Sequence, residues 1–311
     1  MDVSIVIVNY NVSALLNECL QSIKKETSFP YEIIVVDNNS QDDSLEVIKM
    51  YHPDVKLIEN QRNIGFAKAN NLAFLRARGR YIFMLNPDTV ILDGAIDKLV
   101  SFMEKHPEAS ACGPKNLNPD LTLQHNCHHF PSISMAIVEY LQLKRFFPTH
   151  KIFGREHMTY WKYDDIRVVD WITGCSFMMR REILENMGYL DENYFMYAEE
   201  CDLCYRIKKK KMKTVYFPQA SIIHYGGQSS FTENYKKVHS KIIIEYLFKS
   251  RYYFFKKNYG REMEFLLRIL DIIYFGFILL RNNLAFSKKS RLERIDLAKI
   301  ILRVAIKYGK D

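Results

Sequence analysis

The sequence of 311 residues predicts an α/β fold, a mixed and mostly parallel sheet between layers of helices, followed by a helical C-terminal extension. Two observations predict this fold. Apolar runs of strand length alternate with segments of helical periodicity over the first hundred residues, which is the pattern of parallel sheets covered by helices. From about residue 238 onward only helical periodicity is found, so the last part of the chain is expected to be entirely helical.

Continuous apolar runs are typical of strands buried on both faces. They place the expected strands at residues 3–8, 32–36, 55–59, 81–85, 109–112 and 214–217, and further regular runs lie at residues 168–174, 175–179 and 222–224. Helical spacing of apolar residues places helices at residues 15–23, 42–48, 67–78, 94–105, 133–143, 180–187, 199–210, 242–257, 262–280 and 292–308. Residues 114–168 lack clear periodicity apart from one helix, and we expect an irregular insertion there.

These patterns predict two regions. Residues 1–230 are expected to form one domain, with a nucleotide-binding half at residues 1–113 and a second half at residues 114–230. Residues 231–311 are expected to form a basic helical C-terminal region. Neither a GxGxxG motif nor a GxxxxGK[ST] motif occurs, which argues against a dinucleotide-binding fold and against a P-loop.

The start of the chain has no basic segment before its short apolar run, so we expect no signal peptide. No run of 18 apolar residues occurs, so a spanning helix is not expected. Six cysteines are scattered through the chain, and reduced thiols in the cytoplasm are the simplest interpretation.

Charge is distributed unevenly along the chain. Residues 1–204 contain 20 Lys and Arg against 28 Asp and Glu, net −8, whereas residues 205–311 contain 24 against 8, net +16. A basic region of this kind predicts an anionic partner, either a membrane surface or a nucleic acid.

A polar turn follows the apolar run at residues 81–85. Asn86, Pro87 and Asp88 end the strand, because Pro87 cannot donate to a sheet ladder. Asp88 therefore lies at the carboxyl end of a central strand, where open α/β sheets bind ligands. A carboxylate there can bind a hard cation, and the cation can bind a diphosphate. Taken alone, Asn-Pro-Asp is good turn chemistry, and a turn is then the favoured interpretation; the other motifs of the chain reverse that preference.

Other polar residues also follow predicted strands or begin a helix. Asp37 follows the second strand, His224 follows the last one, and three acids open the helix at residues 199–210. Because parallel strands end at one edge of the sheet, these distant residues are expected to converge on one cleft.

At these residues the chain resembles the inverting glycosyltransferases of family 2, which have the GT-A fold, a Rossmann-like sheet. The resemblance covers about residues 3–228. Each motif alone is weak, but the order and spacing of the motifs together are specific. Within the family, Asn-Pro-Asp-Thr together with the late His resembles the rhamnosyltransferase-like and galactofuranosyltransferase-like branch. The matching stretches are SIVIVNYN at 4–11, EIIVVDNNS at 32–40, NIGFAKANN at 63–71, LNPDT at 85–89, WITGCSF at 171–177, EECDLCYR at 199–206 and PQASIIH at 218–224.

The resemblance implies a nucleotide-sugar donor and a role for each matching residue. Asp37 would accept a hydrogen bond from the imide N–H of uracil or thymine, which favours a UDP- or dTDP-sugar; a capping Asx turn is the structural alternative. The residues expected beside the nucleotide, ribose and phosphates are Asn9, Asn63, Gly65, Asn70 and Asn86.

The resemblance also implies a divalent metal, Mg²⁺ or Mn²⁺. Asp88 stands at the second Asp of the family's DxD motif, while Asn86 replaces the first and offers an uncharged ligand oxygen. His224 would be the second protein ligand, and its imidazole suits Mn²⁺ somewhat better than Mg²⁺. A lone His of this kind is otherwise a core or surface residue.

A carboxylate is expected to be the general base that deprotonates the acceptor hydroxyl. The family's base maps to Glu200, one methylene longer than the family's Asp, and Glu199 and Asp202 remain alternatives. Acids that merely complement the helix dipole would explain the enrichment but not the flanking motif. Trp171 and Gly174 resemble the acceptor-side wall, so the half at residues 114–230 would bind the acceptor; a buried core Trp is the alternative.

The remaining motifs are weaker. A CxxC at Cys201 and Cys204 is expected to pack in the core, with zinc or redox use as the alternative. Three histidines, His125, His128 and His129, do not have diagnostic metal-ligand spacing, and an acceptor-side loop is the preferred interpretation.

The basic tail favours a peripheral membrane enzyme at the inner face of the plasma membrane, with a glycan acceptor on a polyprenyl diphosphate. Alternatively its helices form a homodimer or cap the first domain.

Two other classes of protein compete with the glycosyltransferase. A nucleotidyltransferase should carry an early basic Gly-rich loop, which is missing here. A nucleic-acid-binding protein is disfavoured by the acidic first two-thirds, and no nucleic-acid partner is expected.

Overall fold

The computed structural model describes residues 1–226, 233–283 and 289–309, with side chains described at residues 1–226, 241–281 and 294–309. The chain divides into two compact units. The first unit contains residues 1–130 and 148–193 and continues from residue 199 through strand β12 (Lys213–His224). The second contains residues 131–147, residues 194–198 and the C-terminal helices. Two short internal segments therefore group with the C-terminal region.

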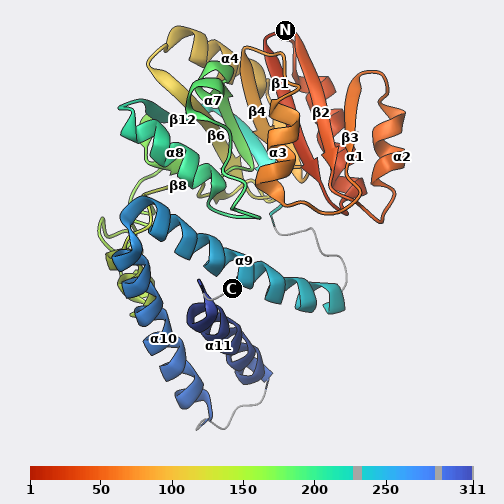
Figure 1. Ribbon diagram of the computed structural model, residues 1–311. Helices are drawn as coiled ribbons and strands as arrows, with labels where there is room; N and C mark the ends of the chain where they lie inside the picture. Colours follow the sequence, from red (N-terminus) through yellow and green to blue (C-terminus); the bar gives the residue numbers. More distant parts are fainter. Residues whose placement is uncertain (227–232, 284–288, 310–311) are drawn as a thin grey trace. The chain divides into compact units, whose positions relative to one another are not determined.

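The first unit is built on a mixed sheet with the strand order β3-β2-β1-β4-β11-β6-β12-β5 (Figure 1). Strands β1, β2, β3 and β4 are parallel, as expected for alternating strands and helices, whereas β11 and β5 run antiparallel to their neighbours. The strands of this path span Val3–Asn9 (β1), Tyr31–Asp37 (β2), Val55–Glu59 (β3), Tyr81–Leu85 (β4), Thr89–Leu92 (β5), Ala109–Leu117 (β6) and Ser176–Arg180 (β11). The predicted α/β class is confirmed.

Helices cover both faces of this sheet. The main core lies between the sheet and helices α1, α2 and α4, where residues such as Ile5, Phe83 and Leu99 are fully buried. In Figure 1, α3, α7 and α8 lie on the opposite face. The helices of this unit span Ser13–Glu26 (α1), Ser44–Met50 (α2), Phe66–Phe74 (α3), Ala95–Lys105 (α4), Arg181–Met187 (α7) and Glu199–Lys209 (α8).

Three details differ from the sequence prediction. Strand β5, which follows Asp88 directly, was not expected. The strand predicted at residues 214–217 continues through residues 222–224 as one strand, β12. Its register is irregular between Phe217 and Ser221, where Pro218 removes a backbone donor. Helix α3 ends at Phe74, earlier than predicted, because residues up to Gly79 form turns before β4.

The region predicted as an irregular insertion contains short strands and helices. Strands β7 and β9 extend the main sheet by pairing with β6 and β12, while β8 and β10 form a separate two-stranded sheet. These strands span Leu123–Gln124 (β7), Cys127–His128 (β8), Arg167–Val169 (β9) and Trp171–Ile172 (β10). Loops join them, so the absence of periodicity is explained by short pairings rather than by disorder.

The second unit is helical, as predicted for the C-terminal region. It contains α5 (Ile133–Tyr140), α6 (Leu143–Phe146), α9 (Glu233–Tyr259), α10 (Arg261–Asn283) and α11 (Lys289–Lys307). Buried Asp271 of α10 accepts hydrogen bonds from Tyr140 of α5 and from Tyr252 of α9. This network explains why residues 131–147 belong to this unit. Within the part of the chain that is described, no helix combines the length and the apolarity needed to cross a membrane.

Candidate active site

The carboxyl ends of β1 and β2 place Asn9 beside Asp37. The parallel register pairs these two residues, and Asn9 Nδ2 donates to Asp37 Oδ1 at 2.9 Å. Asp37 also accepts bonds from the backbone N–H of Ser40 at 2.9 Å and from its hydroxyl at 2.6 Å. Both side chains are buried. The Asx turn is therefore present, and it leaves room for a ligand, because a carboxylate has about four acceptor positions and three are used here.

Asn38 organises the neighbouring loop, a role that the sequence analysis missed. Its Nδ2 donates to Asn63 Oδ1 at 3.0 Å, and its Oδ1 accepts from the Ile64 N–H and from Asn60 Nδ2, each at 3.1 Å. The Asn63 oxygen in turn accepts from the Gly65 N–H. Gly65 has φ +88°, a conformation that favours glycine. The predicted residues Asn63 and Gly65 thus form a rigid loop beside Asp37.

The two asparagines of α3 have different roles. Asn70 donates to the carbonyl of Phe66 in its own helix, and among the described residues its buried Oδ1 has no partner. Asn71 instead exchanges two hydrogen bonds with the backbone of Leu190, which ties α3 to the segment before α8. The unpaired Asn70 oxygen is consistent with the predicted ligand role, whereas Asn71 holds the fold.

Strand β5 explains how Asp88 meets His224. The antiparallel register of β12 with β5 pairs His224 with Thr89, the residue after Asp88. His224 Nε2 consequently lies 3.4 Å from Asp88 Oδ1, and the Tyr225 N–H donates to the Asp88 carbonyl at 2.9 Å. The two predicted metal ligands, 136 positions apart in the sequence, are neighbours.

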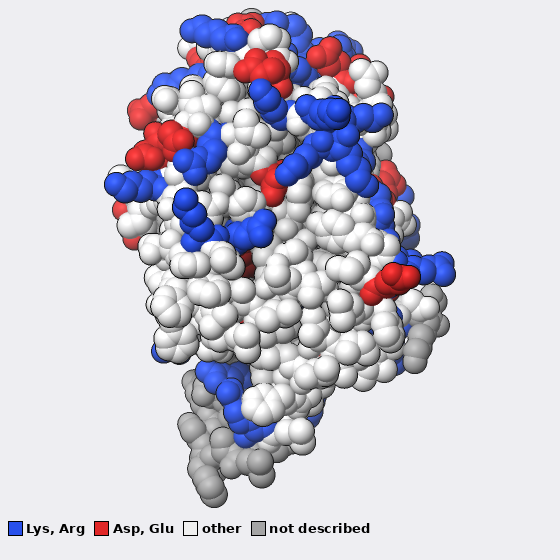
Figure 2. Space-filling view, turned by 90° about the vertical axis from the view of Figure 1, so that its left-hand side faces the viewer, with Lys and Arg blue, Asp and Glu red and all other residues white. Residues whose placement is uncertain are grey.

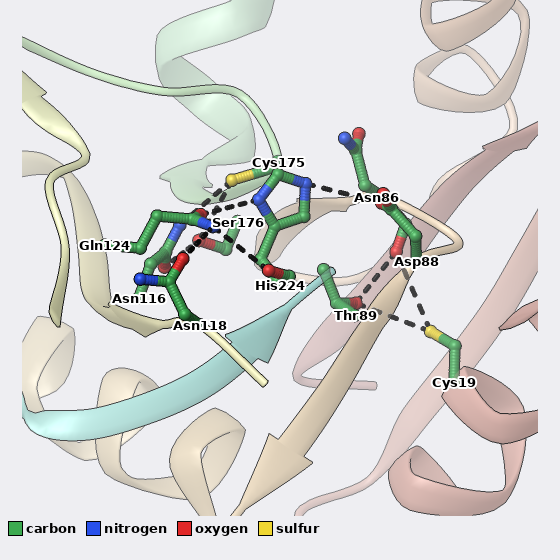
Figure 3. A network of polar contacts seen from close by, with 10 residues as sticks. All are labelled: Cys19, Asn86, Asp88, Thr89, Asn116, Asn118, Gln124, Cys175, Ser176 and His224. Atoms are coloured by element: carbon green, nitrogen blue, oxygen red, sulfur yellow. Dashed lines mark hydrogen bonds and ion pairs between the residues drawn. The ribbon is translucent and has the colours of Figure 1, made fainter. Parts of the chain in front are cut away.

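A polar network holds the His224 ring from its other side (Figure 3). His224 Nδ1 is 2.7 Å from Gln124 Oε1. Asn116 donates to the sulfur of Cys175 at 3.0 Å and accepts from the Ser176 hydroxyl at 2.9 Å. A second partner that fixes the ring's tautomer and orientation is a regular feature of metal-binding histidines. The sequence analysis did not identify these partners, since none follows a recognisable motif.

The charge state of His224 follows from its surroundings. Burial lowers the pKa of His224, but Cys175 and Asp88 outweigh this effect and raise the pKa to about 11. Without a metal ion the ring therefore carries a proton and pairs with the Asp88 carboxylate. A metal ion would replace that proton, because imidazole must be neutral to bind a metal.

Glu199, Glu200 and Asp202, the three acids at the start of α8, are all buried. Glu200 Oε1 accepts a hydrogen bond from the Gly174 N–H at 3.1 Å. Gly174 packs so closely that an added Cβ would lie 3.5 Å from two Glu200 carbons and 2.8 Å from the end of Met84. Among the described residues, Oε2 of Glu199 and Oε2 of Glu200 have no hydrogen-bond partner.

The protonation of these acids differs. Burial, followed by the charge of Glu200, raises the pKa of Glu199 well above its ordinary value. Burial also raises the pKa of Glu200, but the backbone N–H groups of Gly174, Glu200 and Cys201 oppose the rise. These backbone N–H groups therefore stabilise the ionised form of Glu200, whereas the charge of Glu200 disfavours the ionised form of Glu199. Asp202 forms an ion pair with Arg206 at 3.0 Å, so its carboxylate is engaged within the helix.

The predicted acceptor wall contains Trp171 in contact with histidines. Its indole N–H donates to the His129 carbonyl at 3.0 Å, and its ring stacks on His128 with centroids 4.1 Å apart. The Trp171 side chain is only partly buried, which leaves part of it accessible. Three residues further along the chain, the Gly174 N–H donates to Glu200, so the segment that contains Trp171 also contacts this acid.

Two motifs are structural. Cys201 and Cys204 are buried and unpaired, and burial raises the pKa of each thiol, so core packing is confirmed. His128 bonds to the Thr173 hydroxyl and the Glu156 carbonyl, while His129 bonds to Asp170 and Tyr160.

Within residues 1–226, 233–283 and 289–309, no group of three or more His, Cys, Asp or Glu residues forms a metal cluster. A metal at Asp88 and His224 would need further ligands from its substrate.

The fold is that of the GT-A glycosyltransferases, and the comparisons specify the family. Residues 4–188 match glycosyl transferase family 2, so the chain belongs to that family and is a glycosyltransferase. A relative named N-acetylglucosaminyl-diphospho-decaprenol L-rhamnosyltransferase, from Mycobacterium tuberculosis, is 26% identical over 240 residues, which cover 73% of this chain and 76% of that protein. Rhamnosyltransferase WbbL of Escherichia coli is 26% identical over 264 residues, covering 80% of this chain and 94% of that protein.

Solved structures support the fold. A mannosyltransferase from Pyrobaculum calidifontis, in complex with GDP-Man and Mn²⁺, superimposes with a TM-score of 0.58 at 15% identity, covering 98% of this chain and 86% of that one. TarS from S. aureus gives a TM-score of 0.51 at 16% identity, covering 100% of this chain and 92% of that one. At this identity the likeness establishes the GT-A fold alone.

Proposed function

We propose that this enzyme is an inverting glycosyltransferase that transfers a sugar, most readily L-rhamnose, from a UDP- or dTDP-sugar to a hydroxyl of a lipid-linked glycan during cell-surface polysaccharide synthesis. The observation that carries the proposal is the placement of Glu200, a buried carboxylate held by the Gly174 N–H with one oxygen unpaired among the described residues. The names of the relatives support the sugar and the lipid-linked acceptor.

The reaction is a single displacement. The acceptor hydroxyl gives its proton to Glu200 Oε2 while its oxygen bonds to the anomeric carbon of the donor. The bond from that carbon to the phosphate oxygen breaks, and its electron pair leaves with the nucleoside diphosphate. Attack from the face opposite to the leaving group inverts the anomeric configuration. Glu200 is favoured over Glu199 because backbone N–H groups stabilise its ionised form, and over Asp202 because Asp202 is paired with Arg206.

The donor set near the leaving group suits a divalent metal. Asp88 and His224 offer one carboxylate and one imidazole 3.4 Å apart in a buried position, and Asn86 begins the same turn. Such ligands fit Mn²⁺ and also accommodate Mg²⁺. A bound metal would neutralise charge on the departing diphosphate. The Mn²⁺ in the similar mannosyltransferase structure supports this assignment.

The nucleotide would lie at the ends of β1 and β2. One acceptor position of Asp37 remains after its three internal hydrogen bonds, and it would accept the N3–H of uracil or thymine. The unpaired Asn70 oxygen and the Asn38–Asn63–Gly65 loop would face the ribose and phosphates. Cytosine has no N3–H, so a cytidine donor would lose this contact.

Transfer with purified enzyme tests the proposal. The enzyme is incubated with dTDP-L-rhamnose or a UDP-hexose, a polyprenyl-diphosphate-linked sugar and Mn²⁺, and the anomeric configuration of the product is determined by NMR. We expect inversion, with no transfer in EDTA. Retention of configuration would refute the mechanism, and efficient transfer from a cytidine-linked donor would refute the role of Asp37.

Association with an anionic membrane surface is the second part of the proposal. Helix α10 exposes large apolar side chains at helical spacing, and the one charged residue between Arg268 and Arg281, Asp271, is buried. Figure 2 shows a wide area with few Lys, Arg, Asp or Glu side chains on the face that it draws. The exposed apolar residues of α10 include Phe265, Leu266, Ile273, Phe277 and Leu280. Such a face suits the boundary between lipid headgroups and acyl chains.

The basic residues of this region would add electrostatic attraction to anionic lipids. The lysines at 236–237 and the cluster at 288–291 lie outside the described side chains. Flotation with phosphatidylglycerol vesicles tests this part. We expect Ile273→Ser with Phe277→Ser to weaken binding, whereas the control Met50→Ser, an exposed residue of α2, should not. If the double variant formed a monomer from a wild-type dimer and floated equally well, the face would be a dimer interface instead.

A further inference from the structure

A cavity of about 630 Å³ lies within the segment that was predicted to be an irregular insertion. Four cations line it: Lys151, Arg155, Lys162 and Arg167. Two carboxylates, Asp164 and Asp165, also line it and leave the lining with a net charge of +2 when histidine is neutral. The volume is in the range of about 300–1,000 Å³ that is usual for small-molecule sites. Because concave walls focus the field of such charges, the cavity attracts anions more strongly than a flat basic surface.

Three of these cations have no internal partner. Within the described residues, no ion pair joins Lys151, Arg155 or Lys162 to a carboxylate. Arg167, in contrast, pairs with Asp165 at 3.1 Å and lies over the Trp161 ring, 4.3 Å from its centroid. Asp165 is thereby compensated, and the fork of Arg167 is fixed in place. An unpaired group of two ammonium ions and a guanidinium offers the donors that phosphate oxygens require.

The cavity shares a wall with the acceptor side of the active site. His129 lines it and bonds to Tyr160, a second lining residue, at 2.8 Å. The carbonyl of His129 also accepts the Trp171 indole N–H. Gly174, which holds Glu200, follows Trp171 by three residues, and three residues of extended chain span at most about 10 Å. An anion in the cavity and a hydroxyl at Glu200 can therefore belong to one acceptor molecule.

We propose that this cavity binds the phosphate groups of the acceptor, so that Lys151, Arg155 and Lys162 hold a diphosphate while a sugar hydroxyl reaches Glu200. The inference rests on the proposed function and names the acceptor's anionic group. It makes these cations determinants of acceptor specificity, separate from the metal that would hold the donor's diphosphate at Asp88. No covalent change takes place in the cavity.

Binding of inorganic pyrophosphate in EDTA tests the cavity without requiring activity. EDTA removes the divalent metal through which the donor site would bind pyrophosphate. We expect saturable binding to the full-length enzyme by calorimetry. We expect at least tenfold weaker binding after combined Lys151→Ala, Arg155→Ala and Lys162→Ala. The control combines Lys210→Ala, Lys211→Ala and Lys213→Ala, which removes the same charge from exposed positions near the end of α8, and should change affinity less than twofold.

A variant that should bind pyrophosphate more tightly distinguishes loss of the site from misfolding. Asp164→Asn removes a carboxylate from the lining and should tighten pyrophosphate binding several-fold, which a damaged protein would not do. Equal weakening by both triple variants, or no binding of pyrophosphate to the wild type, would overturn the proposal. Loss of phosphatidylglycerol vesicle flotation with unchanged pyrophosphate affinity would also overturn it, since the cations would then bind lipid headgroups.

The acceptor itself supplies the final measurement. With a polyprenyl-diphosphate-linked sugar, the cavity variant should raise KM for the acceptor at least tenfold and leave KM for the nucleotide sugar unchanged. An unchanged acceptor KM would refute the assignment of the cavity to the acceptor. If pyrophosphate binds as expected but no glycosyl transfer is found with any donor, the proposed function fails while the anion site stands.

Discussion

Replacing Glu200 by Gln tests the assignment of the base most directly. The Gln side chain keeps the carbonyl oxygen that accepts the Gly174 N–H, so the backbone of α8 should not move. What is lost is the capacity to accept a proton at the position of Oε2. General base catalysis contributes about 10²–10⁴-fold to a rate. At about 1.36 kcal/mol per factor of ten, this is roughly 2.7–5.4 kcal/mol of activation free energy.

The assay is steady-state transfer at saturating donor and acceptor, so that kcat rather than substrate affinity is compared. We expect kcat of Glu200→Gln to fall at least 100-fold with the Kd for the nucleotide sugar unchanged. Glu199→Gln is the matched control, because Glu199 is the adjacent buried acid and because burial and the charge of Glu200 raise its pKa. Its kcat should stay within tenfold of the wild type. Full activity of Glu200→Gln would refute the reasoning, and an equal loss in Glu199→Gln would move the base to that residue.

Three further outcomes are expected. Because the pKa of Glu200 is raised, kcat/KM should increase with pH along an acidic limb that lies above pH 4.5, and a limb at or below pH 4.5 would contradict the raised pKa. The free energy of unfolding should decrease over the same pH range, because burial disfavours the ionised form of Glu200. Asp88→Asn should weaken Mn²⁺ binding, measured by calorimetry, at least tenfold, whereas the control Asp120→Asn, at an exposed position, should not weaken it. Equal Mn²⁺ affinities of Asp88→Asn and the wild type would show that Asp88 is not a metal ligand. Asp202→Asn should lower the free energy of unfolding in urea by about 1–3 kcal/mol, a limited loss because Arg206 keeps its bonds to three backbone carbonyls. The kcat of this variant should stay within tenfold of the wild type. A loss of activity without a loss of stability would restore Asp202 as a candidate base.

The fold class and most of the candidate residues follow from local sequence. Buried parallel strands require continuous apolar runs, and polar residues must follow where such strands end. Local patterns alone therefore locate Asn9, Asp37 and Asp88 at the carboxyl edge of a sheet. The acidic start of α8 is equally local. The assignment of the two halves to donor and acceptor stays a prediction.

Local sequence patterns could not predict the pairing between distant segments. Strand β5 has only four residues, too few for a periodic signal, yet its register with β12 brings His224 to Asp88. Asn38 and Gln124 likewise have roles only because loops fold back onto them. Such contacts depend on hydrogen bonds between segments that lie far apart in the chain, and single-residue preferences carry no information about them.

The sequence by itself thus determined the class of protein and the edge of the sheet at which the candidate site residues lie. The proposal that Glu200 rather than Glu199 is the base rests on tertiary structure alone, because pKa values depend on burial and on the backbone N–H groups that reach each carboxylate. It also decided that the segment without periodicity encloses a basic cavity, since four cations spread over residues 151–167 become one site only when the chain closes around them.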